Sequence, residues 1–197
     1  FAGIHGATIV SGMLQMFWLT NLGMNQSALA AGTPLPHIFM EVFWTFFIVI
    51  GGSGATMGLV MCYLRSRSAH LRSIGRLSVV PSVFNINEPV IFGTPIVMNP
   101  VFFIPFLLAP MVNAVIAWGA MKMDLIGRVI SVVPWTAPAP IGAAWGLGWD
   151  FRAAILVVIL AVVSGIIYYP FFKVYEKQLL DQEAEEAARA EQENQVA

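Results

Sequence analysis

The sequence predicts an all-α polytopic membrane protein in which transmembrane helices alternate with proline-broken re-entrant loops. Of its 197 residues, 58% are hydrophobic and only 11% are charged, whereas soluble domains carry about 25% charged residues. Residues 96–118 and 151–172 are each long and apolar enough to cross a bilayer. Residues 84–95 and 133–142 are apolar but rich in proline, and irregular backbone at membrane depth occurs only where it lines a cavity or is buried in protein.

The N-terminal residues 1–20 are apolar and glycine-rich, with His5 as their only ionisable group. They fit either the end of a transmembrane helix or a short re-entrant piece. No basic segment precedes them, so they do not resemble a signal peptide, and we expect the chain to be the C-terminal portion of a longer transporter. The polar residues 21–36 are predicted to form a loop outside the bilayer.

Residues 39–64 are long enough to form a further crossing. Four glycines lie between positions 51 and 58, and small residues at this density either let a neighbouring helix pack closely or mark a kink. Glu41 belongs to the first turns of this segment. Two places stay open for it, the membrane interface at the helix N-terminus or a substrate cavity.

The linker over residues 65–76 carries four arginines and a histidine, with no acid to offset them. The positive-inside bias of membrane proteins places such a linker in the cytoplasm. Anionic lipid headgroups or a soluble protein partner would each explain its charge.

The segment around Glu88 is the one on which the functional interpretation depends. Glu88 is the only acidic residue between positions 41 and 124, and Asn85 and Asn87 precede it. Burying a lone carboxylate is costly unless it is paired, hydrogen-bonded or facing water. Pro89 and Pro95 keep this acid out of the middle of a regular helix. We therefore expect a re-entrant loop or broken helix that holds a buried, substrate-facing acid.

The C-terminal end combines the most continuous apolar helix, residues 151–172, with a charged tail, residues 176–197. We predict that the tail is a solvated cytoplasmic helix and that residues 1–175 form the membrane-embedded part. If the tail and the linker at 65–76 are both cytoplasmic, an even number of crossings separates them. The two apolar helices supply two crossings, so the two proline-rich segments are predicted to enter from opposite sides and to converge on one cavity.

The polar groups expected at membrane depth suit a neutral ligand that is rich in hydroxyl groups. Carboxylates and amides hydrogen-bond sugar hydroxyls, and an indole packs against the C–H face of a sugar ring. The sequence has neither clustered acids for a metal pathway nor a basic stripe for nucleic acid, so we expect no metal, no other cofactor and no nucleic acid. The single cysteine, Cys62, lies in an apolar run and is expected to be an unreactive bystander. The polar groups are His5, Asn85, Asn87, Glu88, Asn99, Asn113, Trp135 and Thr136.

Five stretches of the sequence share the pattern of a known family. They are G-I-H-G at 3–6, G-G-S-G-A-T at 51–56, N-I-N-E-P-V-I-F-G at 85–93, P-I-V-M-N-P at 95–100 and P-W-T-A-P at 134–138. Together they resemble enzyme IIC, the membrane component of the bacterial phosphoenolpyruvate-dependent phosphotransferase system (PTS), in its lactose, cellobiose and diacetylchitobiose branch. The resemblance covers residues 1 to about 175 and lacks the family's N-terminal helices.

This resemblance implies a sugar permease of the bacterial inner membrane that forms a homodimer through those N-terminal helices. It would bind a disaccharide of the cellobiose, diacetylchitobiose or lactose type and present the 6-hydroxyl to a phosphocysteine on a separate IIB protein. Glu88 would accept the proton of that hydroxyl, and His5 would be the second polar contact at the reacting end. The resemblance places Asn85, Asn87, Trp135 and Thr136 around the sugar. No phosphorylated residue is expected on the chain itself, which would be the permease subunit of a phosphotransferase.

Two other functions are compatible with the sequence. A proton-coupled secondary sugar transporter would use Glu88 and His5 as a proton relay, and its uptake would collapse with the proton gradient. A membrane scaffold would pair Glu88 structurally, but the apolar segments offer no arginine or lysine for that pair.

Overall fold

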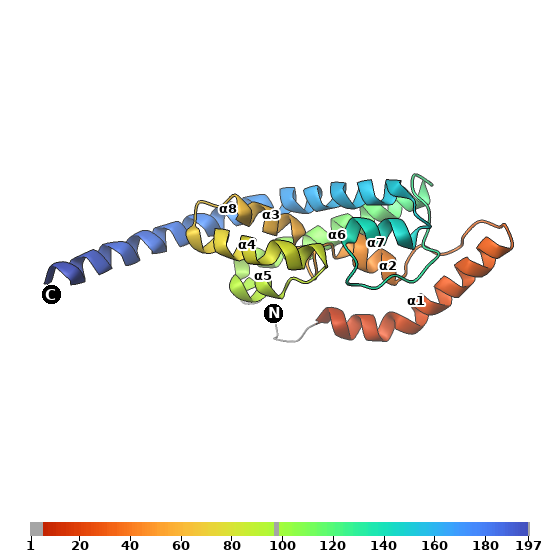
Figure 1. The fold of residues 1–197 in the computed structure, drawn as a ribbon, viewed down its shortest axis with the longest axis horizontal. Coiled ribbons are helices and arrows are strands. Elements are labelled where there is room, and N and C mark those ends of the chain that lie inside the picture. The colour runs from red at the N-terminus through yellow and green to blue at the C-terminus, as the bar shows by residue number, and fades with distance from the viewer. Residues whose placement is uncertain (1–5, 97–98, 197) are drawn as a thin grey trace.

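The computed structural model describes residues 6–96 and 99–196, which are helical or irregular (Figure 1). The long helix α8 runs along the bundle and continues past the other helices towards the C-terminus, whereas α1 lies at one side of the bundle (Figure 1). The helices in chain order are α1 (Gly6–Ala30), α2 (Glu41–Phe43), the π-helical turn η1 (Trp44–Ile48), α3 (Met57–Leu64), α4 (Ala69–Val83), α5 (Glu88–Gly93), α6 (Pro100–Lys122), α7 (Ala139–Gly146) and α8 (Phe151–Val196).

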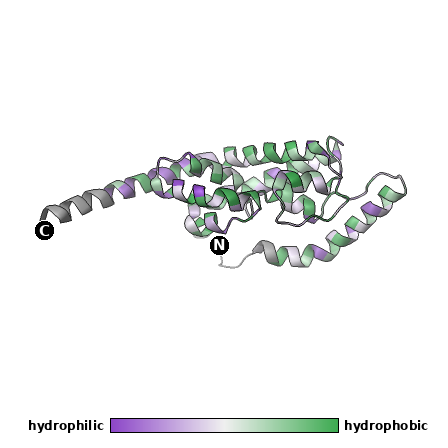
Figure 2. Ribbon diagram, viewed as in Figure 1, coloured by the Kyte–Doolittle hydropathy of each residue, from purple (hydrophilic) through white to green (hydrophobic). Residues whose placement is uncertain are grey.

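Two of the described helices are long and apolar enough to cross a membrane, α6 and the part of α8 over Phe151–Glu185. They correspond to the predicted crossings, and Figure 2 shows hydrophobic residues along the part of α8 that lies on the bundle. The side chain of Asn99 caps α6 by accepting a hydrogen bond from the backbone N–H of Val101. Pro105 and Pro110 lie inside α6 without ending it. Asp150 caps the N-terminus of α8, because its carboxylate accepts a hydrogen bond from the backbone N–H of Arg152. It also accepts one from the backbone N–H of Gly127.

The core consists of two apolar clusters that both use α6 and α8. The first gathers η1, α7 and the N-terminal half of α8 around Phe46 and Phe47, which are fully buried. Gly142 of α7 makes room for the ring of Phe46, since a Cβ on Gly142 would lie 2.4 Å from that ring. The second cluster gathers α3, α4 and the later turns of α8 around Tyr63 and Tyr168. Helices α6 and α8 are therefore the common support for everything else.

Helices α3 and α8 touch through their backbones. A Cβ on Gly58 would lie 2.2 Å from the backbone nitrogen of Gly165, a distance that real Cβ atoms do not reach. Small residues at helix crossings allow this approach in membrane proteins. Of the two roles considered for the glycines at 51–58, close packing is therefore the role of Gly58.

The prediction of a loop over residues 21–36 is wrong for residues 21–30, because α1 continues to Ala30. The polar side chains in that stretch make tertiary contacts. Asn25 is buried, and its Nδ2 donates to the carbonyls of His37 and Val129, each at 2.9 Å. Asn21 donates to the carbonyl of Phe39. These amides fasten α1 to distant segments, a use that polarity along the sequence does not distinguish from a loop.

The predicted crossing over residues 39–64 is also wrong as one helix. Helix α2 leads directly into η1, which ends at Ile48, and α3 begins only at Met57. Between them Gly51, Gly52 and Gly54 have φ angles of 76°, 102° and 80°, values that favour glycine over residues with a Cβ. Of the two alternatives for these three glycines, the break in the helix is confirmed.

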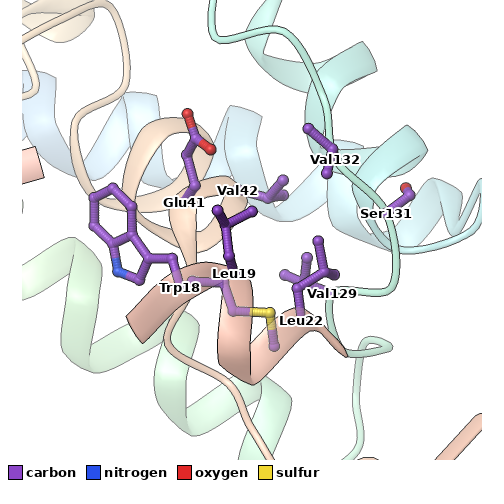
Figure 3. A pocket seen from close by; sticks show the side chains of 9 residues that line it. Trp18, Leu19, Leu22, Glu41, Val42, Val129, Ser131 and Val132 are labelled. Carbon is purple, nitrogen blue, oxygen red and sulfur yellow. The ribbon is translucent and has the colours of Figure 1, made fainter. Parts of the chain in front are cut away.

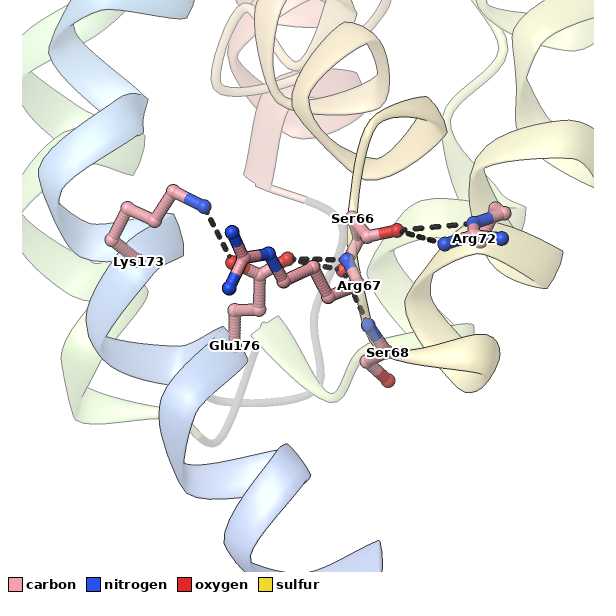
Figure 4. Close-up of polar contacts among 6 residues, drawn as sticks. All are labelled: Ser66, Arg67, Ser68, Arg72, Lys173 and Glu176. Atoms are coloured by element: carbon pink, nitrogen blue, oxygen red, sulfur yellow. Dashed lines mark hydrogen bonds and ion pairs between the residues drawn. The ribbon is translucent and has the colours of Figure 1, made fainter.

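The tail is better anchored than predicted. Helix α8 passes residue 175 without a break, and Glu176 is only 3% exposed. Its carboxylate accepts hydrogen bonds from the Ser66 hydroxyl and the Arg67 backbone (Figure 4). Both are 2.7 Å long. Two turns further along α8, Glu183 accepts a 2.6 Å hydrogen bond from the hydroxyl of Ser68. The expectation of a purely solvated tail is therefore wrong at Glu176 and Glu183, whose carboxylates bind the loop before α4.

Candidate functional site

The residue Glu88 opens the short helix α5, directly after Asn87 at the N-cap position. Val90 and Ile91 take the inward face of this helix and are buried, at 0% and 8% exposure. Glu88 points outward and is exposed. The prediction that Glu88 avoids the middle of a regular helix is confirmed, but the expectation that it is buried is wrong for the described chain. Its exposure leaves the carboxylate accessible to a ligand.

The side chain of Asn85 joins two segments that are far apart in the sequence. Its Oδ1 accepts a 3.1 Å hydrogen bond from the backbone N–H of Gly51. Its Nδ2 donates to the carbonyls of Trp135 and Ala137, at 3.0 and 3.3 Å. The backbone of Asn85 has a φ of 60°, a region in which asparagine is better tolerated than most residues. Asn85 thus holds the glycine-rich turn and the Trp135 loop together.

Asn87 fastens the same glycine-rich turn from the other side. It is 2% exposed, and its Nδ2 donates to the carbonyl of Ser53 at 2.7 Å and to the hydroxyl of Thr56 at 3.0 Å. The hydroxyl of Thr56 in turn donates to the carbonyl of Gly51. Gly52 lies so close that a Cβ on it would meet the Asn87 side chain at 2.4 Å. The amide of Asn87 is therefore engaged with the protein.

Residues 51–56, 85–88 and 135–137 form one unit that we call the loop junction. Five of the six predicted site residues belong to it. Asn85 and Asn87 hold it together by their amides, whereas Glu88, Trp135 and Thr136 are exposed on it. Trp135 is 55% exposed. The sixth, His5, lies outside the described residues.

Sequence reasoning missed two residues that support the loop junction. Thr56 was not distinguished from the glycines around it, although its hydroxyl links Gly51 to Asn87. The buried hydroxyl of Tyr168 on α8 donates to the carbonyl of Gly54 at 2.7 Å. A lone tyrosine in an apolar helix carries an obligatory hydrogen-bond donor, and that signal indicates a polar partner at depth.

The remaining polar residues predicted at depth have structural partners. Asn99 caps α6, as described above. Asn113 is buried between α6 and α8 and donates to the hydroxyl of Ser164 at 3.0 Å. These contacts place Asn113 in the helix packing.

The residue Glu41 lies in the first turn of α2, and Gln15 donates to its carboxylate at 3.5 Å. It borders a small cavity between α1 and the loop that contains Val129 and Ser131, drawn in Figure 3. The cavity volume is about 10 Å³, which is room for about one water molecule. A sugar does not fit there, so the position at a helix N-terminus is the one that the structure supports for Glu41.

The loop junction gives a direct test in Asn85→Gly. Glycine adopts the positive φ freely, so this variant removes the amide without straining the backbone. We expect a loss of about 2–4 kcal/mol in the free energy of unfolding, because the Gly51 N–H and two carbonyls lose their partner. Thermal unfolding of the purified protein measures this. Asn21→Ala, which removes one exposed hydrogen bond, is the control, and equal unfolding temperatures for the two variants would contradict the linking role of Asn85.

Comparison with known proteins decides the family. The family model described as "Phosphotransferase system, EIIC" matches residues 1–110, more than half of the chain. The chain belongs to this family. The lichenan permease IIC component of Bacillus subtilis is 40% identical over 183 residues, which make up 92% of this chain and 40% of that protein. The lactose-specific EIICB component of Streptococcus mutans is 40% identical over 188 residues, 94% of this chain and 33% of that protein.

A solved structure agrees with the family. The crystal structure of the transporter ChbC, the IIC component of an N,N'-diacetylchitobiose-specific phosphotransferase system, superposes with a TM-score of 0.88 at 41% identity. The match covers 92% of this chain and 43% of ChbC. The predicted fold and the lactose/cellobiose branch of the EIIC family are thereby confirmed. The chain spans 33–43% of the length of these three relatives.

Proposed function

We propose that this chain is the sugar-binding part of a PTS permease of the bacterial inner membrane and binds a disaccharide at the loop junction. The observation that supports this best is that some polar side chains of the loop junction hold its loops together while others are exposed. The buried residues Asn85 and Asn87 fix three loops by hydrogen bonds, and an acid, an indole and a hydroxyl are left exposed on them. Such a set suits a sugar, since hydroxyls take hydrogen bonds and the ring packs on an aromatic face.

The substrate class follows from the branch of the family. Relatives in this branch are named for lichenan, lactose and N,N'-diacetylchitobiose, so the proposed substrate is a disaccharide of the cellobiose, diacetylchitobiose or lactose type. Trp135 would be the platform for one sugar ring, and Thr136 would bond a hydroxyl. Asn85 and Asn87, whose Nδ2 groups are engaged, would act by positioning these side chains.

The chemical step in this proposal is transfer of a phosphoryl group from a phosphocysteine of a separate IIB protein to the sugar 6-hydroxyl. The sulfur–phosphorus bond breaks as the hydroxyl oxygen bonds to phosphorus, and Glu88 accepts the hydroxyl proton. Catalysis of phosphoryl transfer rests mainly on positioning and charge, and a carboxylate adds a proton acceptor. His5 would be the second polar contact at this end of the sugar.

The partner surface would lie on the basic segment at 65–76, on the side proposed to be cytoplasmic. Arg67, His70 and Arg76 are exposed there, while Arg72 is committed to the carbonyl of Ser66. Exposed cations steer a complementary acidic surface and raise its association rate. The proposed assembly is a homodimer that uses segments outside this chain.

The test is the chemical form of the sugar after uptake. Membrane vesicles containing the protein receive radiolabelled cellobiose, lactose or diacetylchitobiose and phosphorylated IIB on the cytoplasmic side. The proposal predicts phosphorylated disaccharide inside, insensitive to a protonophore. Unmodified sugar that accumulates without IIB and is lost with a protonophore would overturn it in favour of proton-coupled transport.

A further inference from the structure

A groove runs along the outer face of α8, between α3 and α7, and its volume is about 810 Å³. Its walls are apolar, and three of its lining side chains on α8, those of Val158, Val162 and Ile166, are 54–67% exposed. Neither Glu88 nor Trp135 lines it. The groove is therefore separate from the loop junction.

The depth of the groove comes from the close contact between α3 and α8 at Gly58 and Gly165. Gly58 and Gly165 both line it, and their contact brings the backbones of α3 and α8 together at its floor. Along α8 the lining extends from Val157 to Lys173, which is about 24 Å at 1.5 Å per residue. The groove is therefore long enough along α8 to hold an extended apolar chain.

One end of the groove is positively charged. Arg65 and Lys173 line it, and the exposed Arg67 lies two positions after Arg65 in the chain. The Lys173 ammonium lies 5.2 Å from the ring centroid of Phe172 and 5.7 Å from that of Tyr169, and it forms an ion pair with Glu176 at 2.6 Å. Figure 4 shows that this carboxylate is shared with Ser66 and the Arg67 backbone. The cations Arg65 and Lys173 thus line this end of the groove, and the acid paired with Lys173 already accepts hydrogen bonds from Ser66 and the Arg67 backbone.

We propose that the groove binds one acyl chain of an anionic phospholipid, whose phosphate lies at Arg65 and Lys173. The apolar length exceeds the roughly 15 Å of one leaflet of bilayer hydrocarbon, so a complete lipid tail fits along it. Lipid tails are as apolar as the groove wall, so the tail alone gives no preference between lipids. The preference for an anionic lipid comes from the cationic end of the groove. One to two cations near a charged headgroup raise the affinity about tenfold.

The experiment uses the purified, delipidated protein in detergent. It is titrated with phosphatidylglycerol or phosphatidylcholine that carries a photoactivatable diazirine in its acyl chain, and cross-linked peptides are mapped by mass spectrometry. We expect phosphatidylglycerol to label the peptides of α3 and α8 at about tenfold lower concentration than phosphatidylcholine. Arg65→Gln with Lys173→Gln should reduce this preference to less than about twofold. Arg76→Gln with Lys177→Gln removes the same charge from exposed positions that do not line the groove. This control should leave the preference for phosphatidylglycerol unchanged.

A second pair of variants keeps the test independent of the Lys173–Glu176 ion pair. Val162→Trp fills the groove, whereas Ile159→Trp adds the same ring to an exposed α8 position that does not line it. Loss of α8 labelling in the first variant alone supports the proposal. Equal labelling by the two lipids, or equal labelling of the two tryptophan variants, would overturn it. So would cross-linking of Val162→Cys to another protein segment in place of lipid.

Discussion

Replacing Glu88 with glutamine is expected to lower the rate of disaccharide phosphorylation by phosphorylated IIB about 100-fold or more, while sugar binding stays within about threefold of wild type. Glutamine keeps the size of the side chain and can still hydrogen-bond a hydroxyl, but it does not accept a proton at neutral pH. Glu88 is exposed on the loop junction, so the substitution leaves no buried group without a partner. The change therefore acts on chemistry more than on folding.

The measurement is formation of radiolabelled phosphosugar in vesicles with a fixed amount of phosphorylated IIB, alongside equilibrium binding of the unmodified sugar. Glu41→Gln is the matched control, because Glu41 is also a carboxylate in the first turn of a helix but borders only the 10 Å³ cavity. A phosphorylation rate for Glu88→Gln within threefold of wild type would remove Glu88 from the chemical step.

Gly58→Ala is expected to destabilise the protein strongly, whereas Gly165→Ala on the other side of the same contact is expected to be tolerated. In Gly58→Ala the added Cβ would lie 2.2 Å from the backbone nitrogen of Gly165. The backbone of a packed helix cannot move aside as a flexible side chain can. In Gly165→Ala the added Cβ meets its nearest atom, the Gly58 Cα, at 3.5 Å, which is ordinary contact. Forced overpacking costs about 3 kcal/mol.

Thermal unfolding of the two variants in detergent checks this asymmetry. Gly119→Ala serves as a third variant, since nothing lies within 4 Å of the added methyl group, and it should raise the unfolding temperature slightly through helix propensity. If Gly58→Ala and Gly165→Ala lowered the unfolding temperature equally, the contact would be a general small-residue interface, and the geometry described for this crossing would be wrong.

The sequence predicted the parts of the fold that follow from apolar length. The crossings α6 and α8 needed only continuous runs of hydrophobic residues. The breaks were harder, because the glycines at 51, 52 and 54 were equally consistent with close packing until their positive φ angles were known. The extent of α1 was missed because the partners of Asn21 and Asn25 are the backbone of residue 37 and beyond, which no local pattern records.

Residue types and family resemblance predicted which residues belong to the candidate site. They did not predict the structural role of each residue. Asn85 and Asn87 were expected to line the sugar, and the structure shows their Nδ2 groups donating to backbone carbonyls and to Thr56. The bonds between Glu176 and the loop at 66–68 were missed because they join residues about 110 positions apart. Charge in a tail indicates solvation by default, and only the fold brings these partners together.

The measurement that tests the central claim most directly is disaccharide binding to Trp135→Ala, by titration calorimetry with cellobiose, lactose and diacetylchitobiose. The claim is that the loop junction holds the sugar. Trp135 is 55% exposed on it, and its removal should weaken binding of the preferred sugar about tenfold through loss of the ring contact. Trp149→Ala removes another exposed indole, one that stacks on Trp145, and should bind like wild type. An unchanged dissociation constant for Trp135→Ala, or an equal loss in Trp149→Ala, would contradict the placement of the sugar at the loop junction.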